Sequence, residues 1–260
     1  MLRLKQIVCG LLGVGTCLAC LAESSTSVFA DLPVLVYHRF DPQTAGPTTV
    51  RTSTFKAQMA WLAGHNYKIV PLAQVKALVR DGHSPDPGAV AITADDGHRS
   101  IYTEMFPVIR EQRIPVTLFI YPSAISRARW ALTWDELREM QRSGLVDVQS
   151  HTYWHPNFRQ EKARLSPGEY HAFVMFQLKH SRQVLERQLS TRVDLLAWPF
   201  GVVDPELEEA AAQAGYVAAF AYTGGPAWAG ANRFAIPRIP VSDRDAGNAL
   251  AKLLQPARER

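Results

Sequence analysis

Short apolar runs that alternate with longer segments of helical period limit the fold of this chain more than any other feature. From Pro33 onward, runs rich in Val, Ile and Leu are separated by segments whose apolar residues recur every three or four positions. This alternation is typical of a parallel sheet wrapped by helices. Most of the expected strands are too uniformly apolar to have one face in water. They cover residues 34–38, 68–70, 89–93, 116–121, 146–150, 193–197, 217–221 and 236–241.

Capping residues mark where helices begin. Thr133 with Glu136 forms the Ser/Thr-x-x-Glu pattern of a capping box. Ser166 with Glu169 repeats the pattern, and Asp204 precedes a proline at a third predicted start. Seven or eight strand-helix units in about 230 residues fit a single α/β domain folded as a distorted (β/α) barrel. The functional residues of such a barrel gather at the carboxyl ends of its strands.

Length and net charge limit the number of domains and the class of partner. The chain has 260 residues, of which 47% are hydrophobic, and this fits one large domain better than two small ones. The net charge is +4, and no run of five or more like charges is present. A nucleic-acid partner is therefore not expected.

The N-terminus has the pattern of a secretory signal peptide. Arg3 and Lys5 precede an uncharged apolar stretch over residues 7–22, which a short Ser/Thr segment follows. The small-x-small pattern of a cleavage site precedes two cleavage points, after Ala22 and after Ala30, and the second is favoured.

Cleavage after Ala30 would remove all three cysteines with residues 1–30 and leave a domain over residues 31–260. That domain would have no disulfide and no transmembrane segment. A retained N-terminal anchor and lipidation at Cys20 are the alternatives. We expect a monomer that is secreted or periplasmic, in the bacterial envelope.

Two adjacent carboxylates follow the expected strand 89–93. Asp95 and Asp96 stand before Gly97, at the strand end where a barrel places functional groups. Taken alone, this motif is explained more simply by an ordinary Asp-Gly turn.

A histidine pair follows the expected strand 146–150. His151 and His155 are four residues apart, so one helical turn would put both imidazoles on the same side. Two neutral imidazoles and a carboxylate from another strand make a metal site with open positions. Two unrelated loop histidines are the alternative when the pair is taken alone.

The placement of both motifs favours a metal site, because a barrel brings the two strand ends to the same rim. One carboxylate would coordinate the cation. The other would take a proton from the metal-bound water, whose pKa a divalent ion lowers toward about 7. The charge of the ion would also keep that free acid ionised.

These motifs resemble those of the polysaccharide deacetylase family with the NodB-homology domain, carbohydrate esterase family 4. The family motif Thr-Phe-Asp-Asp-Gly corresponds to residues 93–97, and His-Ser/Thr-x-x-His corresponds to residues 151–155. A third motif corresponds to Trp-Pro-Phe-Gly at residues 198–201. The similarity extends over most of the chain after Asp31, and such motifs are specific to the family rather than to a substrate.

The resemblance implies a role for each matching residue. Asp95 would be the general base. Asp96, His151 and His155 would hold a divalent metal, with zinc expected first and cobalt or nickel as alternatives. Phe200 would supply a backbone N–H to the developing oxyanion, which needs no particular side chain.

Two departures from the family concern the base and the leaving group. Ala197 replaces the arginine that usually orients the base, as an apolar residue does in the subgroup acting on poly-β-1,6-N-acetylglucosamine. The chain is therefore nearest to that subgroup. The late family histidine is missing as well. Arg238 is the candidate partner of Asp95, although an arginine cannot act as a general acid, and His38 is a candidate at the same rim.

Aromatic side chains beside the motifs are candidate sugar-stacking platforms, because an aromatic face packs against the apolar face of a sugar. Trp154 and Trp198 adjoin the motifs and are preferred. With His38 and Arg238 they form the expected substrate-binding set, whereas core or rim packing explains the other tryptophans and Tyr153 equally well. The remaining histidines are expected to be structural or solvated: His65, His83, His98, His171 and His180.

The sequence thus predicts a metal-dependent hydrolase that removes N-acetyl groups from an N-acetylglucosamine-containing polysaccharide and releases acetate. An O-acetyl esterase acting on an acetylated glycan is one alternative, because the same attack by water cleaves esters and amides. A non-catalytic glycan-binding protein with the same fold is the other, suggested by Ala197 and the missing late histidine.

Overall fold

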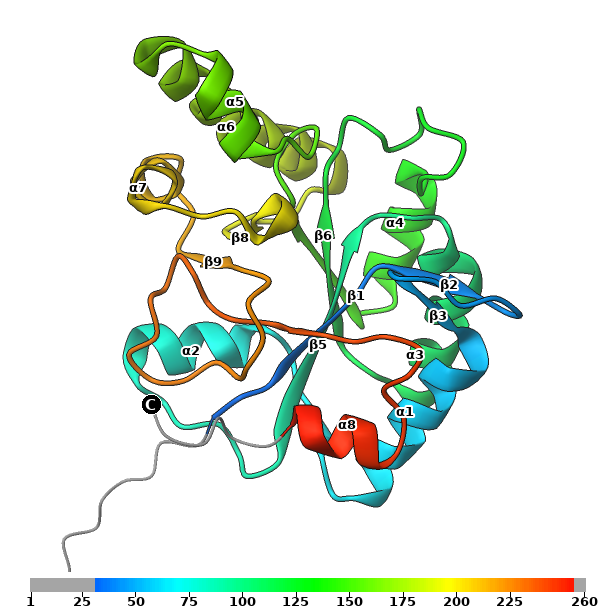
Figure 1. Cartoon of the computed structure of the whole chain (residues 1–260). Coiled ribbons are helices and arrows are strands. Elements are labelled where there is room, and N and C mark those ends of the chain that lie inside the picture. The colour runs from blue at the N-terminus through cyan, green and yellow to red at the C-terminus, as the bar shows by residue number, and fades with distance from the viewer. Residues whose placement is uncertain (1–30, 255–260) are drawn as a thin grey trace, which may run out of the picture.

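The structure, a computed structural model, describes residues 31–254. Helices and strands alternate along most of this part of the chain (Figure 1). The strands are β1 (Val34–Tyr37), β2 (Arg39–Asp41), β3 (Thr49–Arg51), β4 (Lys68–Ile69), β5 (Ala89–Asp96), β6 (Val116–Ile120), β7 (Val146–Ser150), β8 (Leu195–Ala197), β9 (Ala218–Phe220) and β10 (Ile239–Pro240). The helices are α1 (Thr52–Gly64), α2 (Ala73–Asp81), the π-helical η1 (Ile101–Met105), α3 (Phe106–Gln112), α4 (Trp134–Arg142), α5 (Phe158–Arg164), α6 (Pro167–Leu189), the 3₁₀-helical η2 (Pro199–Gly201), α7 (Pro205–Gln213) and α8 (Asn248–Leu253).

One curled parallel sheet forms the centre of the molecule, in the order β10-β1-β5-β6-β7-β8-β9, with β4 beside β5. Its two edges meet through one short segment. The N–H of Ala221 donates to the carbonyl of Ile236 at 2.8 Å, and the N–H of Ile236 donates to the carbonyl of Ala219 at 2.9 Å. A few residues later β10 pairs with β1. The predicted distorted (β/α) barrel is therefore confirmed, and residues 236–240 close it.

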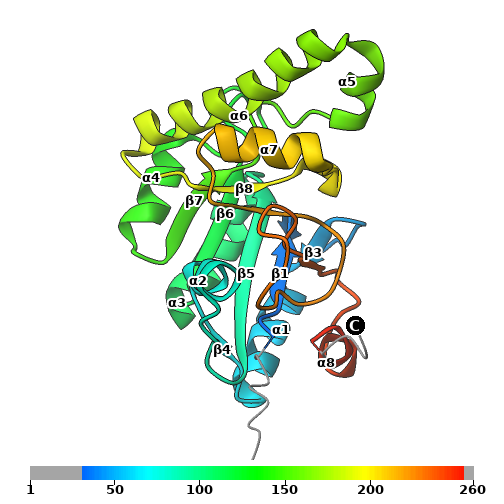
Figure 2. The ribbon, with the colours of Figure 1, turned by 90° about the vertical axis from the view of Figure 1, so that its left-hand side faces the viewer.

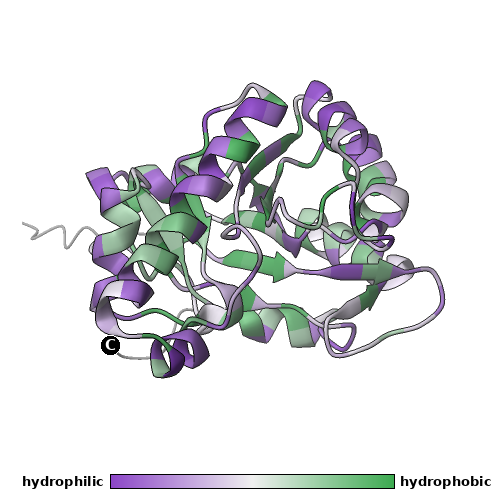
Figure 3. Ribbon diagram, turned by 90° about the horizontal axis from the view of Figure 1, so that it is seen from above, coloured by the Kyte–Doolittle hydropathy of each residue, from purple (hydrophilic) through white to green (hydrophobic). Residues whose placement is uncertain are grey.

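Both faces of the strands are buried, which explains their uniformly apolar sequences. Leu35 and Ile92 belong to a large core shared with the helices. Their neighbours along the strands, Val34 and Ala91, belong to a second core. Successive side chains of a strand point to opposite faces, so the second core lies on the inner face of the sheet, where Val75 and Leu78 of α2 join it. Seen from above, apolar strands lie within a ring of helices that carry many polar residues (Figure 3).

The expected strands are all present, with ends within a few residues of the prediction. The three predicted helix starts are confirmed as well, at Thr133, Ser166 and Asp204. The predicted signal peptide, residues 1–30, lies outside the described residues. None of the helices over residues 31–254 is long and apolar enough to cross a membrane.

Two local predictions differ from the structure. β5 runs on to Asp96, three residues beyond the predicted end, and the backbone turns at Asp96 itself, where φ is 71°. The expected helical turn after β7 is wrong, because residues 151–157 form no helix. Thr152 and His155 have left-handed backbones there, with φ of 66° and 65°, which a right-handed helical turn excludes.

The 23-residue helix α6 follows the loop after β7 and helix α5, and it packs back against β7. It also packs against α4, α5 and α7. Figures 1 and 2 both place it with α5 at the upper end of the molecule. This position brings α6 beside the loop that follows β7.

Gln149 supplements a short strand pairing inside the sheet. In the described part of the chain, β7 and β8 are paired only through Ser150 and Leu196. The Oε1 atom of Gln149 accepts the N–H groups of Asp194 and Leu195 at 3.0 and 2.9 Å, and the residue is 4% exposed. The side chain thus takes the place of a neighbouring backbone carbonyl.

Gln149→Leu is expected to lower the free energy of unfolding by about 2–6 kcal/mol, because two buried N–H groups lose their acceptor at about 1–3 kcal/mol each. Urea unfolding followed by circular dichroism measures this change. Gln183→Leu, at an exposed position of α6, is the control and should change stability by less than about 0.5 kcal/mol. Equal unfolding midpoints for the two variants would contradict the role given to Gln149.

Candidate active site

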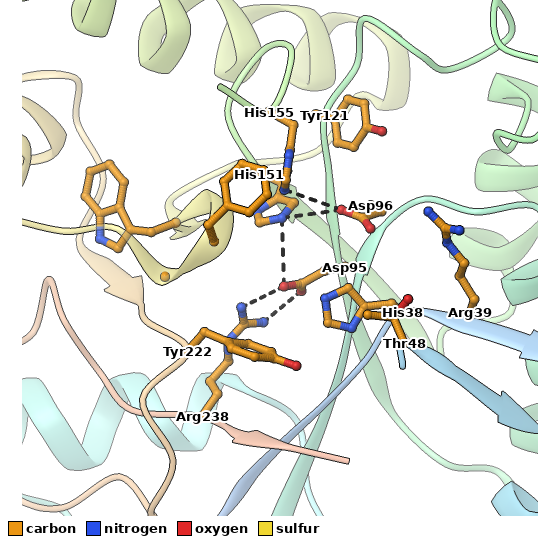
Figure 4. Close-up of a pocket in the computed structure, with 13 residues that line it drawn as sticks. His38, Arg39, Thr48, Asp95, Asp96, Tyr121, His151, His155, Tyr222 and Arg238 are labelled. Carbon is orange, nitrogen blue, oxygen red and sulfur yellow. Dashed lines mark hydrogen bonds and ion pairs between the residues drawn. The ribbon is translucent and has the colours of Figure 1, made fainter. Parts of the chain in front are cut away.

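A cavity of about 380 Å³ opens at the carboxyl end of the sheet. Asp95, Asp96, His151 and His155 line it together with His38 (Figure 4). These residues end or directly follow β5, β7 and β1, apart from His155 in the loop after β7. Parallel strands end at one rim, and this brings together side chains that are far apart in the sequence.

A bidentate ion pair with Arg238 holds Asp95. The two terminal nitrogens of Arg238 donate to Oδ1 and Oδ2 of Asp95, each at 2.7 Å. The side chain of Arg238 is fully buried and that of Asp95 is 2% exposed. The guanidinium also donates to Thr93 Oγ1 and to the carbonyl of Ala221, both at 3.2 Å. Arg238 therefore fixes the orientation of Asp95, the task that the family resemblance assigns to an arginine at the position of Ala197.

The ion pair also keeps Asp95 charged in a buried place. Burial by itself raises the pKa of this carboxyl, but the charge and hydrogen bonds of Arg238 oppose burial, and the pKa lies at about 2. Asp95 is therefore a carboxylate at neutral pH. A carboxylate that is ionised and fixed in place can accept a proton from a group bound beside it.

Donor atoms of Asp96, His151 and His155 converge on a common point. The Nε2 atoms of the two histidines each lie 3.6 Å from Oδ1 of Asp96. One donor atom from each residue lies within 4.8 Å of the others. Donors about 2.1 Å from a zinc ion at tetrahedral angles are roughly 3.4 Å apart. The three side chains therefore fit a two-histidine, one-carboxylate cation site.

A backbone carbonyl orients His151. Its Nδ1 donates to the carbonyl of Ala197 at 2.8 Å, which leaves the Nε2 lone pair free toward Asp96. Burial lowers the pKa of His151 to about 3 and also lowers the pKa of His155. Both imidazoles are therefore neutral at pH 7, the form that binds metal ions.

Asp96 has the opposite electrostatic environment from Asp95. Burial raises its pKa, and the neighbouring Asp95 carboxylate raises it further, although His38 opposes this change. A bound cation would stabilise the ionised form of Asp96. The two adjacent acids are thus suited to different tasks.

Left-handed backbone conformations shape the site. Adjacent residues of a regular strand point to opposite faces, yet Asp95 and Asp96 line one cavity, since Asp96 leaves the strand conformation with a φ of 71°. Thr152, His155 and Phe200 also have positive φ values, of 66°, 65° and 56°. Such conformations cost about 1–3 kcal/mol each and persist only where the surroundings enforce them.

Helix α6 supplies part of that enforcement. Gln177, a fully buried residue of α6, accepts the N–H of Trp154 at 3.1 Å. At the start of the same loop, the hydroxyls of Ser150 and Ser181 are 2.8 Å apart. The segment that carries His155 is therefore tied to α6 at Ser150 and at Trp154.

The other predicted residues lie around this centre. His38 and Phe200 line the cavity. Trp198 also borders it, but the residue is only 1% exposed and its indole N–H donates to a backbone carbonyl at 2.8 Å, so the ring packs below the cavity. Trp154 lies outside the cavity lining and is 47% exposed.

Five lining residues were not predicted as site residues from the sequence: Arg39, Thr48, Tyr121, Gly201 and Tyr222. Tyr121 and Tyr222 closely follow β6 and β9, so the rule of carboxyl strand ends could have found both. Arg39 is adjacent to a predicted residue. Thr48 carries no such signal, because it reaches the cavity from the segment between β2 and β3.

Exposed aromatic side chains gather at the same rim. Within residues 31–254, the exposed large hydrophobic side chains are Trp130, Trp154, Phe176, Phe200 and Tyr222. Phe200 and Tyr222 line the cavity. Trp154 lies between the two histidines in sequence, with its ring 6.3 Å from that of Phe176, and the Trp130 ring is 6.0 Å from that of a lining tyrosine. Aromatic faces around a polar cavity suit a ligand with apolar faces and polar edges, such as a sugar.

Fold and site together define an α/β-barrel protein that combines a candidate two-histidine, one-carboxylate centre with a separately fixed carboxylate. The chain belongs to the polysaccharide deacetylase family, whose model matches residues 73–219.

Relatives and solved structures agree with this assignment. The chain is 24% identical over 226 residues to the YxkH protein of Bacillus subtilis, a match that covers 87% of this chain and 77% of that protein. It is 26% identical over 209 residues to a poly-beta-1,6-N-acetyl-D-glucosamine N-deacetylase of Staphylococcus aureus, covering 78% and 71% of the two chains.

The Streptococcus pyogenes deacetylase PplD in complex with acetate superposes with a TM-score of 0.77 at 20% identity, over 87% of this chain and 99% of that one. IcaB from Ammonifex degensii gives 0.73 at 23% identity, over 86% and 96%. At these identities the two structures establish the shared fold.

Gln177→Leu removes the acceptor of the Trp154 N–H and is expected to loosen the loop that carries His155. We expect the affinity for Zn²⁺ to fall about 10- to 100-fold, the range seen when groups that support metal ligands are changed. Competition with a chelating dye measures the dissociation constant, and circular dichroism checks the fold. Gln183→Leu on the same helix is the matched control. Unchanged zinc affinity in a folded Gln177→Leu protein would rule out this supporting role.

Proposed function

We propose that this chain is a metal-dependent hydrolase that removes N-acetyl groups from an N-acetylglucosamine-containing polysaccharide and releases acetate. One observation carries the proposal. The ionised, fixed Asp95 stands beside three converging donor atoms, from Asp96, His151 and His155, in one cavity. Metal-assisted hydrolysis needs this combination of a positioned base and an adjacent cation site.

The three donors would hold the cation, with zinc expected first and cobalt or nickel as alternatives. A bound divalent ion supplies a Lewis acid and lowers the pKa of the attacking water. Asp95 accepts the proton of that water through the carboxylate that Arg238 orients. The backbone N–H of Phe200 donates to the acetyl oxygen as negative charge develops on it.

We assign to His38 the proton that the departing amine needs. Its ring lies 5.8 Å from that of Tyr222, inside the cavity lining. Two other candidates are weak acids, because burial raises the pKa of Tyr121 to about 12 and also raises the pKa of Tyr222. Histidine is the side chain that most often transfers protons in catalysis. His38 thus fills the role that the missing late histidine leaves open.

Two observations favour a polymer of N-acetylglucosamine as substrate. Aromatic side chains extend the rim beyond the cavity that holds the reacting groups. The Staphylococcus aureus relative is named for deacetylation of poly-β-1,6-N-acetyl-D-glucosamine. We further propose that residues 1–30 are a signal peptide. The domain, residues 31–260, would act as a secreted or periplasmic monomer.

Asp95→Asn is expected to lower acetate release from N-acetylglucosamine oligomers by about 100- to 10,000-fold, the usual contribution of a general base. Zinc content should be unchanged, because the three ligands remain. An enzyme-coupled acetate assay measures the rate, and metal analysis and urea unfolding check the variant.

The same assay separates the alternatives. A wild type that cleaves O-acetylated glycans and no N-acetylated oligomer would be an esterase. A wild type that releases no acetate from either with zinc, cobalt or nickel would be a glycan-binding protein.

Arg238→Gln is expected to move the acid limb of the profile of kcat/KM against pH to higher pH. Arg238 lowers the pKa of Asp95 to about 2, so its loss raises that pKa, and the base must be ionised to act.

The ion pair of Asp95 and Arg238 stabilises the folded wild type above the unfolded pKa of about 4, and this contribution is lost as pH falls toward 2. Arg51→Gln, which removes an exposed bidentate pair with Asp243, is the control. If the acid limb of Arg238→Gln stayed at the wild-type pH, the group that titrates there would not be Asp95.

A further inference from the structure

A second cavity, of about 170 Å³, lies between the start of α4 and the second half of α6. Trp134, Tyr153 and His180 contribute aromatic walls, and Arg127 and Arg187 line it as well. None of these residues takes part in the reaction proposed above.

This second cavity is a neighbour of the active-site cavity. Tyr121 lines the active-site cavity and Pro122 lines the second one, and consecutive Cα atoms are about 3.8 Å apart. Tyr153 belongs to the loop between His151 and His155. The segments that carry residues 121–122 and 151–155 therefore border both cavities.

An exposed aromatic surface adjoins the second cavity. The ring of Phe176, a residue 45% exposed, stacks on His180 with centroids 4.9 Å apart and 17° between the planes. Tyr153 contacts these two rings at 5.5 and 4.5 Å. Trp154, the residue before His155, extends the surface, with its ring 6.3 Å from that of Phe176. Aromatic faces next to hydrogen-bond donors are the lining that binds sugars.

The second cavity carries unbalanced positive charge. Within the described part of the chain, the guanidinium groups of Arg127 and Arg187 make no hydrogen bond or ion pair. The cavity lining contains no Asp or Glu. Two acids close in sequence, Asp135 and Glu186, are already paired with other arginines.

We propose that the second cavity is a sugar site that accepts an acetylated unit of the polysaccharide and rejects a deacetylated one. The carbonyl of an uncharged acetamide group accepts hydrogen bonds from guanidinium N–H groups. Deacetylation replaces it with a basic amine, and in its protonated form that amine is repelled by two cations. The inference rests on the proposed function, because the amine that is rejected is the product of that reaction.

The consequence concerns where amines form along the polymer. If the second cavity must bind an acetylated unit, the enzyme deacetylates a unit only where the nearby unit still carries its acetyl group. Its products would therefore have spaced amines rather than blocks of them.

The test compares two β-1,6-linked N-acetylglucosamine pentamers, one fully acetylated and one deacetylated at an outer unit. Binding to wild-type protein stripped of metal, which prevents turnover, is measured by calorimetry at pH 6, where the amine is protonated. We expect about fivefold tighter binding of the fully acetylated pentamer at low salt, and a ratio close to one in 1 M salt, where the Debye length is about 3 Å.

Variants assign this preference to the second cavity. Arg127→Gln with Arg187→Gln should abolish the low-salt preference, whereas Arg110→Gln with Arg113→Gln, with the same change in net charge on α3 and the residue after it, should retain it. Phe176→Ala should weaken the binding of both pentamers equally.

Three results would overturn the inference: no binding of either pentamer, a ratio of one in the wild type, or a ratio unchanged by the Arg127 and Arg187 substitutions. Much tighter binding of a hexuronate oligomer than of the acetylated pentamer would assign the cavity to an anionic glycan instead. Failure of the zinc-loaded protein to release acetate would contradict the proposed function and leave the measured binding ratio standing.

Discussion

The buried ion pair of Asp95 and Arg238 is the interaction on which the rest of the site depends. Taking two charges out of water costs several kcal/mol per ion, and their attraction repays this only with good geometry and further hydrogen bonds. Both conditions hold, because each carboxylate oxygen accepts a short bond and the guanidinium also reaches a hydroxyl and a backbone carbonyl. The pair leaves Oδ2 of Asp95 3.9 Å from Nε2 of His151, so the fixed acid faces the candidate cation site.

The geometry of the site requires backbone conformations that its residues seldom adopt. Asp96, Thr152, His155 and Phe200 adopt left-handed conformations that non-glycine residues seldom occupy. The stability of the surrounding barrel and the contacts from α6 offset the cost of these conformations. Strain of this kind is maintained where several independent contacts fix one segment, as Gln177 and Ser181 do for the loop after β7.

The sequence was sufficient to predict the barrel and the convergence of the two motifs. Uniformly apolar strands indicate a buried parallel sheet, and residues that directly follow such strands meet at one rim. The sequence could not show how two adjacent acids face one cavity, since that follows from the backbone of Asp96 rather than from its identity. The orientation of His151 depends on the carbonyl of Ala197, an atom that every residue possesses. The bond from Gln177 depends on how α6 is rotated over the sheet, and tertiary packing sets that rotation.

Arg238 lies in the same short segment that closes the barrel between β9 and β1. The base that it orients precedes it by 143 residues, and the three candidate ligands come from strands made much earlier in synthesis. A chain made only as far as β9 therefore has every donor for a cation and lacks the arginine that fixes the base. A segment translated after all three candidate ligands thus decides whether a protein that can hold a metal also has a positioned base.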